Sequence, residues 1–218
     1  MQNDPIAESV MATLLARHPA LAACADKITD AYRILRDSIA QGGTVFVCGN
    51  GGSRADADHI IGELSKGFLL KRKLPAELVE SMSEKLGEDA APLCDRLQMG
   101  MRAMLLDAHP ALSSAYANDV DPVMCYAQQL FVMGRENDVV IGLSTSGNAE
   151  NIRNVFKVAG GRGIKRILFT GNRLGKCEQY ADCVIDVPES ETYKIQELHL
   201  PTYHAICIML EEYFYAGK

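Results

Sequence analysis

Short apolar segments alternate with longer helix-like segments along most of this 218-residue chain. The apolar segments are rich in β-branched residues, which is typical of strands buried in a sheet. The predicted strands are Thr44–Gly49, Met101–Ala108, Asp138–Leu143, Lys165–Gly171 and Asp182–Val187. Strands that alternate with helices predict an α/β fold, in which helices cover both faces of a parallel sheet.

The segments around these strands have the spacing of helices. We expect two helices within residues 4–40, with a break near His18-Pro19, because apolar residues recur there at helical intervals. Further helices are predicted at residues 54–66, 109–116, 122–134 and 149–159, and a last one within Thr192–Tyr215. Pro201 lies in that last segment and lacks a backbone donor, so the helix either kinks there or begins near Leu200.

Residues 71–98 interrupt the alternation. They contain an amphipathic helical pattern in "LPAELVESMSEKLG" and a second short element in "EDAAPLCDRLQ". We interpret this stretch as an insertion. The chain length and its 48% hydrophobic residues suit a single domain over residues 1–218.

Composition argues against several classes of protein. The formal net charge of −6 is spread along the chain, which disfavours nucleic-acid binding. The N-terminus has no signal-peptide pattern, and no apolar stretch approaches the roughly 18 residues of a membrane span. The seven cysteines form no C-x-x-C motif and are odd in number. We therefore expect reduced thiols in a cytoplasmic protein, several of them packed in the core.

Two loops follow predicted strands and have the character of anion sites. In Gly49-Asn50-Gly51-Gly52-Ser53, the glycines let backbone N–H groups approach a ligand, and the following helix dipole favours negative charge. The spacing fits neither the dinucleotide fingerprint nor the nucleotide P-loop. In Ser144-Thr145-Ser146-Gly147-Asn148, three hydroxyls can donate to one phosphate, although they can also merely cap the next helix. Both loops are expected at the carboxyl edge of the sheet, where ligands bind.

Four side chains are candidates for chemistry near these loops. His59 and Glu63 are four residues apart on one predicted helix, so they share a face. The alternative is that they are an ordinary pair on the solvated surface of the helix. Gln196 and His204 are eight residues apart, which places them about 80° apart on a continuous helix. His199 lies elsewhere on that helix and is expected to be structural. A carboxylate with an imidazole is what proton abstraction beside a carbonyl requires. The residues alone thus predict a phosphate-binding domain with a candidate acid–base pair.

Four blocks of the sequence resemble the sugar isomerase (SIS) domain family, and within it the phosphoheptose isomerase branch. They are "CGNGGSRADADHIIGEL", "AND" at residues 117–119, "GLSTSGNAENI" and "KIQELHLPTYH". The first and last blocks together are specific to the branch, whereas "STSGN" alone indicates the wider family. The resemblance implies a three-layer sandwich with a five-stranded parallel sheet. It also implies a homotetramer, with the N-terminal helices of residues 1–41 used in assembly.

The resemblance further implies an activity and a set of site residues. The activity is interconversion of a ketose phosphate and an aldose phosphate through an enediol. The nearest substrate pair is sedoheptulose 7-phosphate and D-glycero-D-manno-heptose 7-phosphate. Glu63 and His204 would be the acid–base pair. The substrate-binding positions would be Asn50, Gly51, Gly52, Ser53, Asn118, Asp119, Ser144, Thr145, Ser146 and Gln196. The positions that hold zinc in family members correspond to His59, Glu63, Gln196 and His204.

Two features depart from the branch. Ala149 stands where members usually carry a second serine after "STSGN", so one phosphate-binding hydroxyl is missing. Residues 71–98 are also longer than in the compact members and could reshape the sugar pocket. Two alternatives therefore stay open. One is an isomerase of another phosphosugar. The other is a non-catalytic relative that senses sugar phosphates or binds the replication initiator DnaA, although initiator-binding relatives lack the acid–base pair that this chain keeps.

Overall fold

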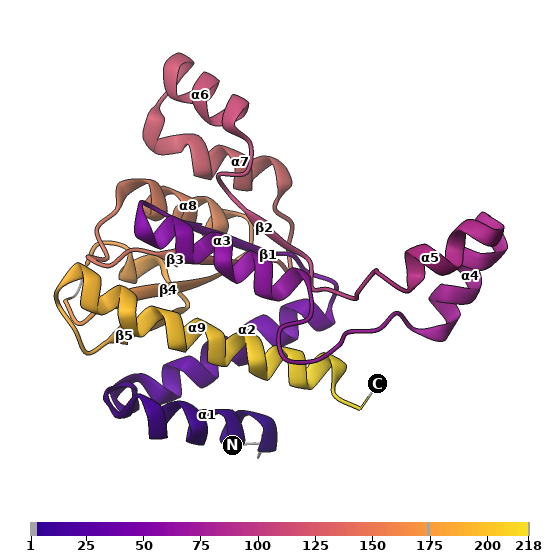
Figure 1. Ribbon diagram of the computed structural model, residues 1–218. Coiled ribbons are helices and arrows are strands. Elements are labelled where there is room, and N and C mark those ends of the chain that lie inside the picture. Colours follow the sequence, from indigo (N-terminus) through magenta and orange to yellow (C-terminus); the bar gives the residue numbers. More distant parts are fainter. Residues whose placement is uncertain (1–3, 174, 218) are drawn as a thin grey trace.

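The structure is a computed structural model that describes residues 4–173 and 175–217. Five parallel strands form one sheet in the order β2-β1-β3-β4-β5 (Figure 1). The strands are β1 Val45–Gly49, β2 Ala103–Leu105, β3 Val139–Leu143, β4 Lys165–Gly171 and β5 Cys183–Val187. Strand order reverses between β1 and β3, so the loops that follow these two strands lie side by side at the switch point where ligands bind.

Helices cover both faces of the sheet. The α-helices are α1 Pro5–Arg17, α2 Ala25–Ala40, α3 Gly52–Ser65, α4 Ala76–Leu86, α5 Ala90–Cys94, α6 Pro110–Asp119, α7 Cys125–Met133, α8 Glu150–Gly161 and α9 Thr192–Tyr215. Short 3-10 turns are η1 Pro19–Cys24, η2 Gly87–Asp89, η3 Pro122–Met124 and η4 Glu178–Tyr180. This arrangement confirms the predicted three-layer α/β fold.

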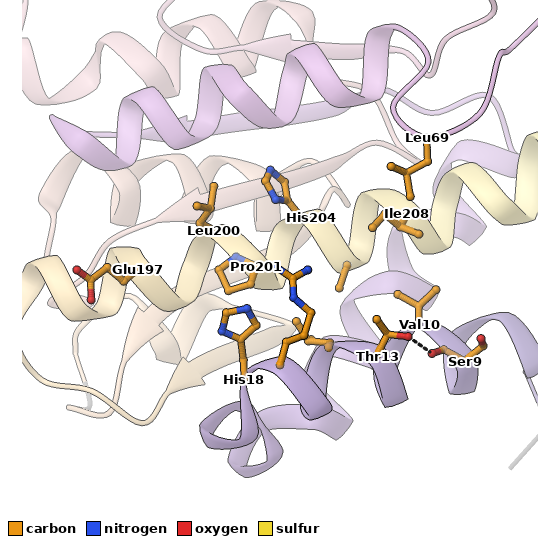
Figure 2. A pocket seen from close by; sticks show the side chains of 13 residues that line it. Ser9, Val10, Thr13, His18, Leu69, Glu197, Leu200, Pro201, His204 and Ile208 are labelled. Atoms are coloured by element: carbon orange, nitrogen blue, oxygen red, sulfur yellow. Dashed lines mark hydrogen bonds between the residues drawn. The ribbon is translucent and has the colours of Figure 1, made fainter.

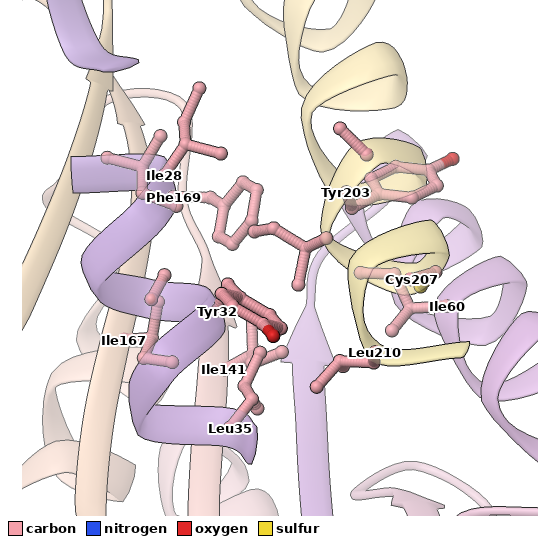
Figure 3. Close-up of a cluster of buried hydrophobic side chains, with 14 of the residues drawn as sticks. Ile28, Tyr32, Leu35, Ile60, Ile141, Ile167, Phe169, Tyr203, Cys207 and Leu210 are labelled. Carbon is pink, nitrogen blue, oxygen red and sulfur yellow. The ribbon is translucent and has the colours of Figure 1, made fainter. Parts of the chain in front are cut away.

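Alternate residues of β1 point to opposite layers. Val45 and Val47 pack with α1, α2, α3 and α9, whereas Phe46 and Cys48 pack with α7 and α8. Figure 3 shows part of the first layer, where Tyr203 from α9 lies beside the apolar cluster and points its hydroxyl away from it. Burying both faces explains why the strands read as continuous apolar runs.

The predicted strand at Met101–Ala108 was too long. Only Ala103–Leu105 pairs with β1, as the edge strand of the sheet. The chain turns immediately afterwards, with the Ala108 N–H donating to the Leu105 carbonyl at 3.2 Å. An edge strand has one neighbour, and that neighbour sets how far its pairing extends.

The helices at both ends of the chain settle two predictions. The break near His18-Pro19 is confirmed, since α1 ends at Arg17 and the turn η1 separates it from α2. Of the two alternatives for the last helix, a start near Leu200 was wrong, because α9 runs from Thr192 to Tyr215 with Pro201 inside it. Gln196 and His204 therefore belong to one helix, and α1 packs along it (Figure 1).

Residues 73–98, called the arm here, project away from the sheet (Figure 1). The arm contains α4, η2 and α5, which matches the two helical patterns predicted within 71–98. Helix α4 has no buried residue. The arm is closed at its base, where the Met99 N–H donates to the Arg72 carbonyl at 2.8 Å.

The cysteines and helices bear on two further predictions. All seven cysteines are free thiols and six of them are buried, which agrees with the expectation of reduced, packed thiols. Within residues 4–173 and 175–217, no helix combines the length and apolar character needed to span a membrane.

Candidate active site

The glycine-rich loop after β1 leads directly into α3 and packs against α9. Gly51 adopts φ +55°, a left-handed conformation that favours glycine. A Cβ added at Gly52 would lie 2.6 Å from the Gln196 amide nitrogen, so a larger residue there would displace the end of the Gln196 side chain. The structure thus brings two predicted substrate-binding positions, Gly52 and Gln196, into contact. Ser53 is buried in the first turn of α3.

A pair of amides joins the two predicted anion loops. The Asn50 amide donates to the Asn151 oxygen at 3.0 Å, and the Asn151 amide donates back at 2.8 Å. Asn151 lies in the first turn of α8, just beyond the serine-rich loop. Sequence reasoning missed it, although its place in the helix that follows that loop was the available signal.

Two hydroxyls of the serine-rich loop after β3 accept hydrogen bonds from nearby backbone N–H groups. Ser144 is buried and its hydroxyl accepts from the Ala149 N–H at 3.4 Å. The Ser146 hydroxyl accepts from the Asn148 N–H at 3.2 Å. A hydroxyl that accepts still has a hydrogen to donate. The Thr145 hydroxyl has no partner in the part of the chain that the structure describes, so all three hydroxyls can donate to an anion.

Three of the four predicted zinc positions gather between α3 and α9. His59 Nε2 lies 3.3 Å from Glu63 Oε1, and Glu63 is buried. The His204 ring lies edge-on to the His59 ring, with centroids 5.0 Å apart. Both predicted acid–base residues, Glu63 and His204, thus belong to one cluster. Gln196 instead contacts Gly52 at the glycine-rich loop.

A hydrogen-bond chain orients His59. The Tyr203 hydroxyl donates to Asp56 at 3.3 Å, and His59 Nδ1 lies 3.0 Å from the same hydroxyl. Because the hydroxyl hydrogen is used, its oxygen accepts from Nδ1–H. The neutral tautomer that donates from Nδ1 to this oxygen leaves the Nε2 lone pair directed toward Glu63. Sequence reasoning missed Tyr203 and Asp56, since neither stands out from an ordinary helix pattern.

His204 lies in an apolar and electropositive surrounding. Burial lowers the pKa of its imidazole, and nearby His59 and Arg17 lower that pKa further, against the opposing effect of Glu63. The neutral form is thereby favoured near pH 7. His204 Nε2 and Glu63 Oε2 are buried without hydrogen-bond partners. The Lys66 ammonium lies 3.6 Å from Glu63 Oε2, beyond hydrogen-bond distance.

The donor atoms suit zinc chemically, because histidine and glutamate are zinc ligands. Two acceptors such as His59 Nε2 and Glu63 Oε1 also repel each other unless a proton or cation lies between them. However, among residues 4–173 and 175–217, no group of three or more His, Cys, Asp or Glu side chains is arranged to hold a metal ion. Zinc therefore stays a prediction, and no chemical step below depends on it.

Asn118 and Asp119 lie apart from this cluster. They end helix α6, are exposed, and Asn118 donates to Asp119 at 2.8 Å. Helix α6 packs on η3 and α7 (Figure 1). Within the described residues, no hydrogen bond links Asn118 or Asp119 to either anion loop. Their predicted substrate-binding role stays a prediction.

His204 also lines a cavity of about 400 Å³ between α1 and α9. Figure 2 shows His18 and Thr13 on the α1 side, and Glu197, Pro201 and His204 on α9. This volume falls within the range of small-molecule sites. The sequence did not predict that α1 would line a cavity beside the acid–base cluster.

Comparison with known proteins agrees with this geometry. Two family models, both described as SIS domain, match residues 11–91 and residues 125–211. The phosphoheptose isomerase of Burkholderia pseudomallei strain K96243 is 36% identical over 205 residues, which cover 94% of this chain and 89% of the relative. The chain therefore belongs to the SIS domain family. Within that family it belongs to the phosphoheptose isomerase branch.

Solved structures of this branch have the same fold. A phosphoheptose isomerase from Neisseria gonorrhoeae superposes with a TM-score of 0.71 at 26% identity, covering 92% of this chain and 94% of that one. One from Francisella tularensis gives a TM-score of 0.74 at 24% identity and covers 92% and 93% of the two chains. At 24% identity, the similarity to the Francisella tularensis structure is evidence for the fold only.

Proposed function

We propose that this protein is an aldose–ketose isomerase that interconverts sedoheptulose 7-phosphate and D-glycero-D-manno-heptose 7-phosphate. The observation that carries the proposal is the cluster of Glu63 with His59 and His204. Two of these residues, His59 and Glu63, lie on α3, the helix that begins at the glycine-rich loop, and His204 faces them from α9. Relatives of this chain are phosphoheptose isomerases, which supports the choice of substrate.

The proposed reaction moves two protons. Glu63 takes a proton from C1 of the ketose while the C2 oxygen gains one, and this gives the enediol. The C1 hydroxyl then loses its proton and C2 gains one, and this gives the aldose. His204, whose pKa is lowered by burial, is suited to move the oxygen protons as a neutral imidazole. A proton held on Glu63 can exchange with solvent before it returns to carbon.

The phosphate is assigned to the two loops at the carboxyl edge of the sheet. Hydroxyl hydrogens of Ser144, Thr145 and Ser146 and backbone N–H groups at the start of α3 are suitable donors. The Asn50–Asn151 pair supports this assignment. Its two hydrogen bonds, of 2.8 and 3.0 Å, link the glycine-rich loop to the start of α8, directly after the serine-rich loop.

The test is turnover by the purified protein with several phosphosugars, followed by NMR. We expect sedoheptulose 7-phosphate to be converted to an aldose heptose phosphate, whereas fructose 6-phosphate and an amino-sugar phosphate react far more slowly. Preference for a six-carbon substrate would instead support the alternative isomerase that Ala149 left open. Binding without turnover of any sugar would support the non-catalytic alternative, a sensor or an initiator-binding protein.

We also propose that the chain is a cytoplasmic homotetramer, and that zinc binds near His59, Glu63, Gln196 and His204. Exposed apolar side chains on α7 support assembly, since Phe131 and Val132 are 52% and 65% exposed in one copy. Light scattering would measure the mass in solution. Elemental analysis of the purified protein, beside a His59→Gln variant, would measure the metal.

A further inference from the structure

A buried ion pair lies beside the acid–base cluster, and no motif drew attention to it. Arg72 donates to Glu211 Oε1 at 2.8 Å, and each residue is only 1% exposed. Burying two charges costs free energy unless every polar atom has a hydrogen-bond partner. Two apolar side chains of similar volume often stabilise a fold as much as a buried ion pair does. An ion pair retained in such a place calls for a role besides stability.

The Glu211 carboxylate holds the chain segment that follows α3. It accepts the backbone N–H groups of Phe68 and Leu69 at 2.7 Å and that of Leu70 at 3.0 Å. These donors and Arg72 outweigh burial and keep the pKa of Glu211 low. The segment is therefore fixed to α9 by a charged acceptor. The Phe68 ring in turn lies 5.3 Å from the His204 ring.

The Arg72 guanidinium holds the end of α3. It donates to the carbonyl of Glu63 at 2.8 Å and to that of Leu64 at 2.7 Å. These carbonyls lie in the last turn of the helix, where a cation is favourable. Arg72 thus contacts the backbone of the proposed catalytic carboxylate itself.

The pair links the two helices that carry the proposed chemistry. Glu63 lies on α3, and Glu211 lies seven residues after His204 on α9, about two turns along the same face. We propose that Arg72 and Glu211 are positioning residues, which fix Glu63 and His204 relative to each other for proton transfer. This inference rests on the proposed isomerase function.

The experiment compares Arg72→Lys and Glu211→Gln with two matched controls. Asp138→Asn removes another buried carboxylate, which lies at the amino ends of the strands, away from the proposed site. It accepts the Thr44 and Arg135 N–H groups at 2.7 Å. Arg166→Lys alters another arginine–carboxylate pair at the same ends of the strands, in which the guanidinium donates twice to Asp182 at 2.8 Å. All proteins are assayed well below their unfolding temperatures, with the folded fraction measured by circular dichroism.

We expect kcat to fall about 10- to 100-fold in Arg72→Lys and Glu211→Gln, with KM within about 2-fold, since small misplacements of reacting groups slow chemistry strongly. The two controls should lose stability but keep wild-type kcat. Folded Arg72→Lys or Glu211→Gln protein with wild-type kcat would overturn the positioning role. Should Glu211→Gln fail to fold, Arg72→Lys alone decides, because it keeps the charge.

A second readout separates this inference from the proposed function. Hydrogen exchange of the Phe68, Leu69 and Leu70 amides should accelerate in Glu211→Gln, and the NMR contact between the Phe68 and His204 rings should weaken. Wild-type protein that converts no phosphosugar refutes the proposed function. Active wild-type protein with unchanged amide exchange and ring contact in Glu211→Gln refutes the positioning role alone.

Discussion

The α3–α9 interface and the arm distribute polar and apolar groups in opposite ways. The interface buries charged side chains, with Glu63, Arg72 and Glu211 at most 8% exposed. The arm exposes apolar ones, with Leu86 and Leu97 at 44% and 49%. Several hydrogen bonds satisfy Arg72 and Glu211, and these bonds also fix their geometry, whereas Glu63 Oε2 is left without a partner among the residues that the structure describes. The comparison teaches that hydrogen bonds at the α3–α9 interface fix the positions of its side chains. The arm of a single copy, in contrast, forms only the helices that its local sequence pattern predicts.

The largest effect is expected from a substitution of His204, which lies at the α3–α9 interface. We expect His204→Gln to lower kcat by about 10²- to 10⁴-fold, the usual contribution of a general acid–base group. Stability should change little, because the imidazole Nε2 has no hydrogen-bond partner to lose. Steady-state turnover and thermal unfolding check both expectations. A variant that unfolds but keeps kcat when folded would make His204 a structural residue.

The opposite side of α9 carries a second histidine with a different role. His199 is fully buried, and its Nε2 donates to the Thr170 carbonyl at 3.2 Å. Burial lowers the pKa of His199 from 6.5 to about 4. The unfolded chain therefore binds a proton more readily between these values, so stability is complete above pH 6.5 and falls as the pH drops toward 4.

This difference corresponds to about 3 kcal/mol of unfolding free energy, at about 1.36 kcal/mol per unit of pKa. Denaturant unfolding of wild type between pH 7 and pH 4 measures it, beside His199→Asn. The variant should show a shallower loss. Equal slopes in both proteins would mean that His199 does not couple folding to pH.

At the serine-rich loop we expect a smaller effect, on binding. Thr145→Val removes a hydroxyl that has no partner in the described part of the chain, so folding should be unaffected. One hydrogen bond to a charged group is typically worth about 1.5–3 kcal/mol. KM should therefore rise at least about 10-fold while kcat changes less. An unchanged KM would show that Thr145 does not contact the phosphate.

The smallest effect is expected from the arm. Replacing residues 74–97 by a short Gly-Ser linker should change kcat/KM by no more than about 2-fold, the range of surface changes. The Arg72 carbonyl and Met99 N–H already meet at the base at 2.8 Å, and Gln98 still accepts from Gly67. A large loss of turnover would contradict the separation of arm and interface, and would favour the expectation that residues 71–98 shape the sugar pocket.

Local patterns predicted most of the fold. The apolar runs predicted the strands, and the spacing of His59 and Glu63 placed them on one helix face. Pro201 could not be resolved from its own chemistry, because packing of α9 along α1 and α3 outweighs the lost donor. The extent of β2 was overestimated, since pairing with β1 limits it.

Long-range contacts in the site could not be predicted in this way. The Asn50–Asn151 pair joins residues 101 positions apart, and Arg72 meets Glu211 across 139 positions. Neither pair has a periodic signal, because each depends on how the fold brings a loop beside a helix that is distant in the sequence. The family resemblance identified Glu63 and His204 but said nothing of the residues that hold them in place.

The central claim is that Glu63 transfers the carbon-bound proton. The most direct measurement is NMR of the reaction with sedoheptulose 7-phosphate in deuterated water, with wild type beside Glu63→Gln. Asp58→Asn is the matched control, since Asp58 is an exposed carboxylate on the same helix. We predict an aldose heptose phosphate with deuterium at C2 from wild type and from Asp58→Asn, and none from Glu63→Gln. Deuterium incorporation by Glu63→Gln at the wild-type rate would contradict the account.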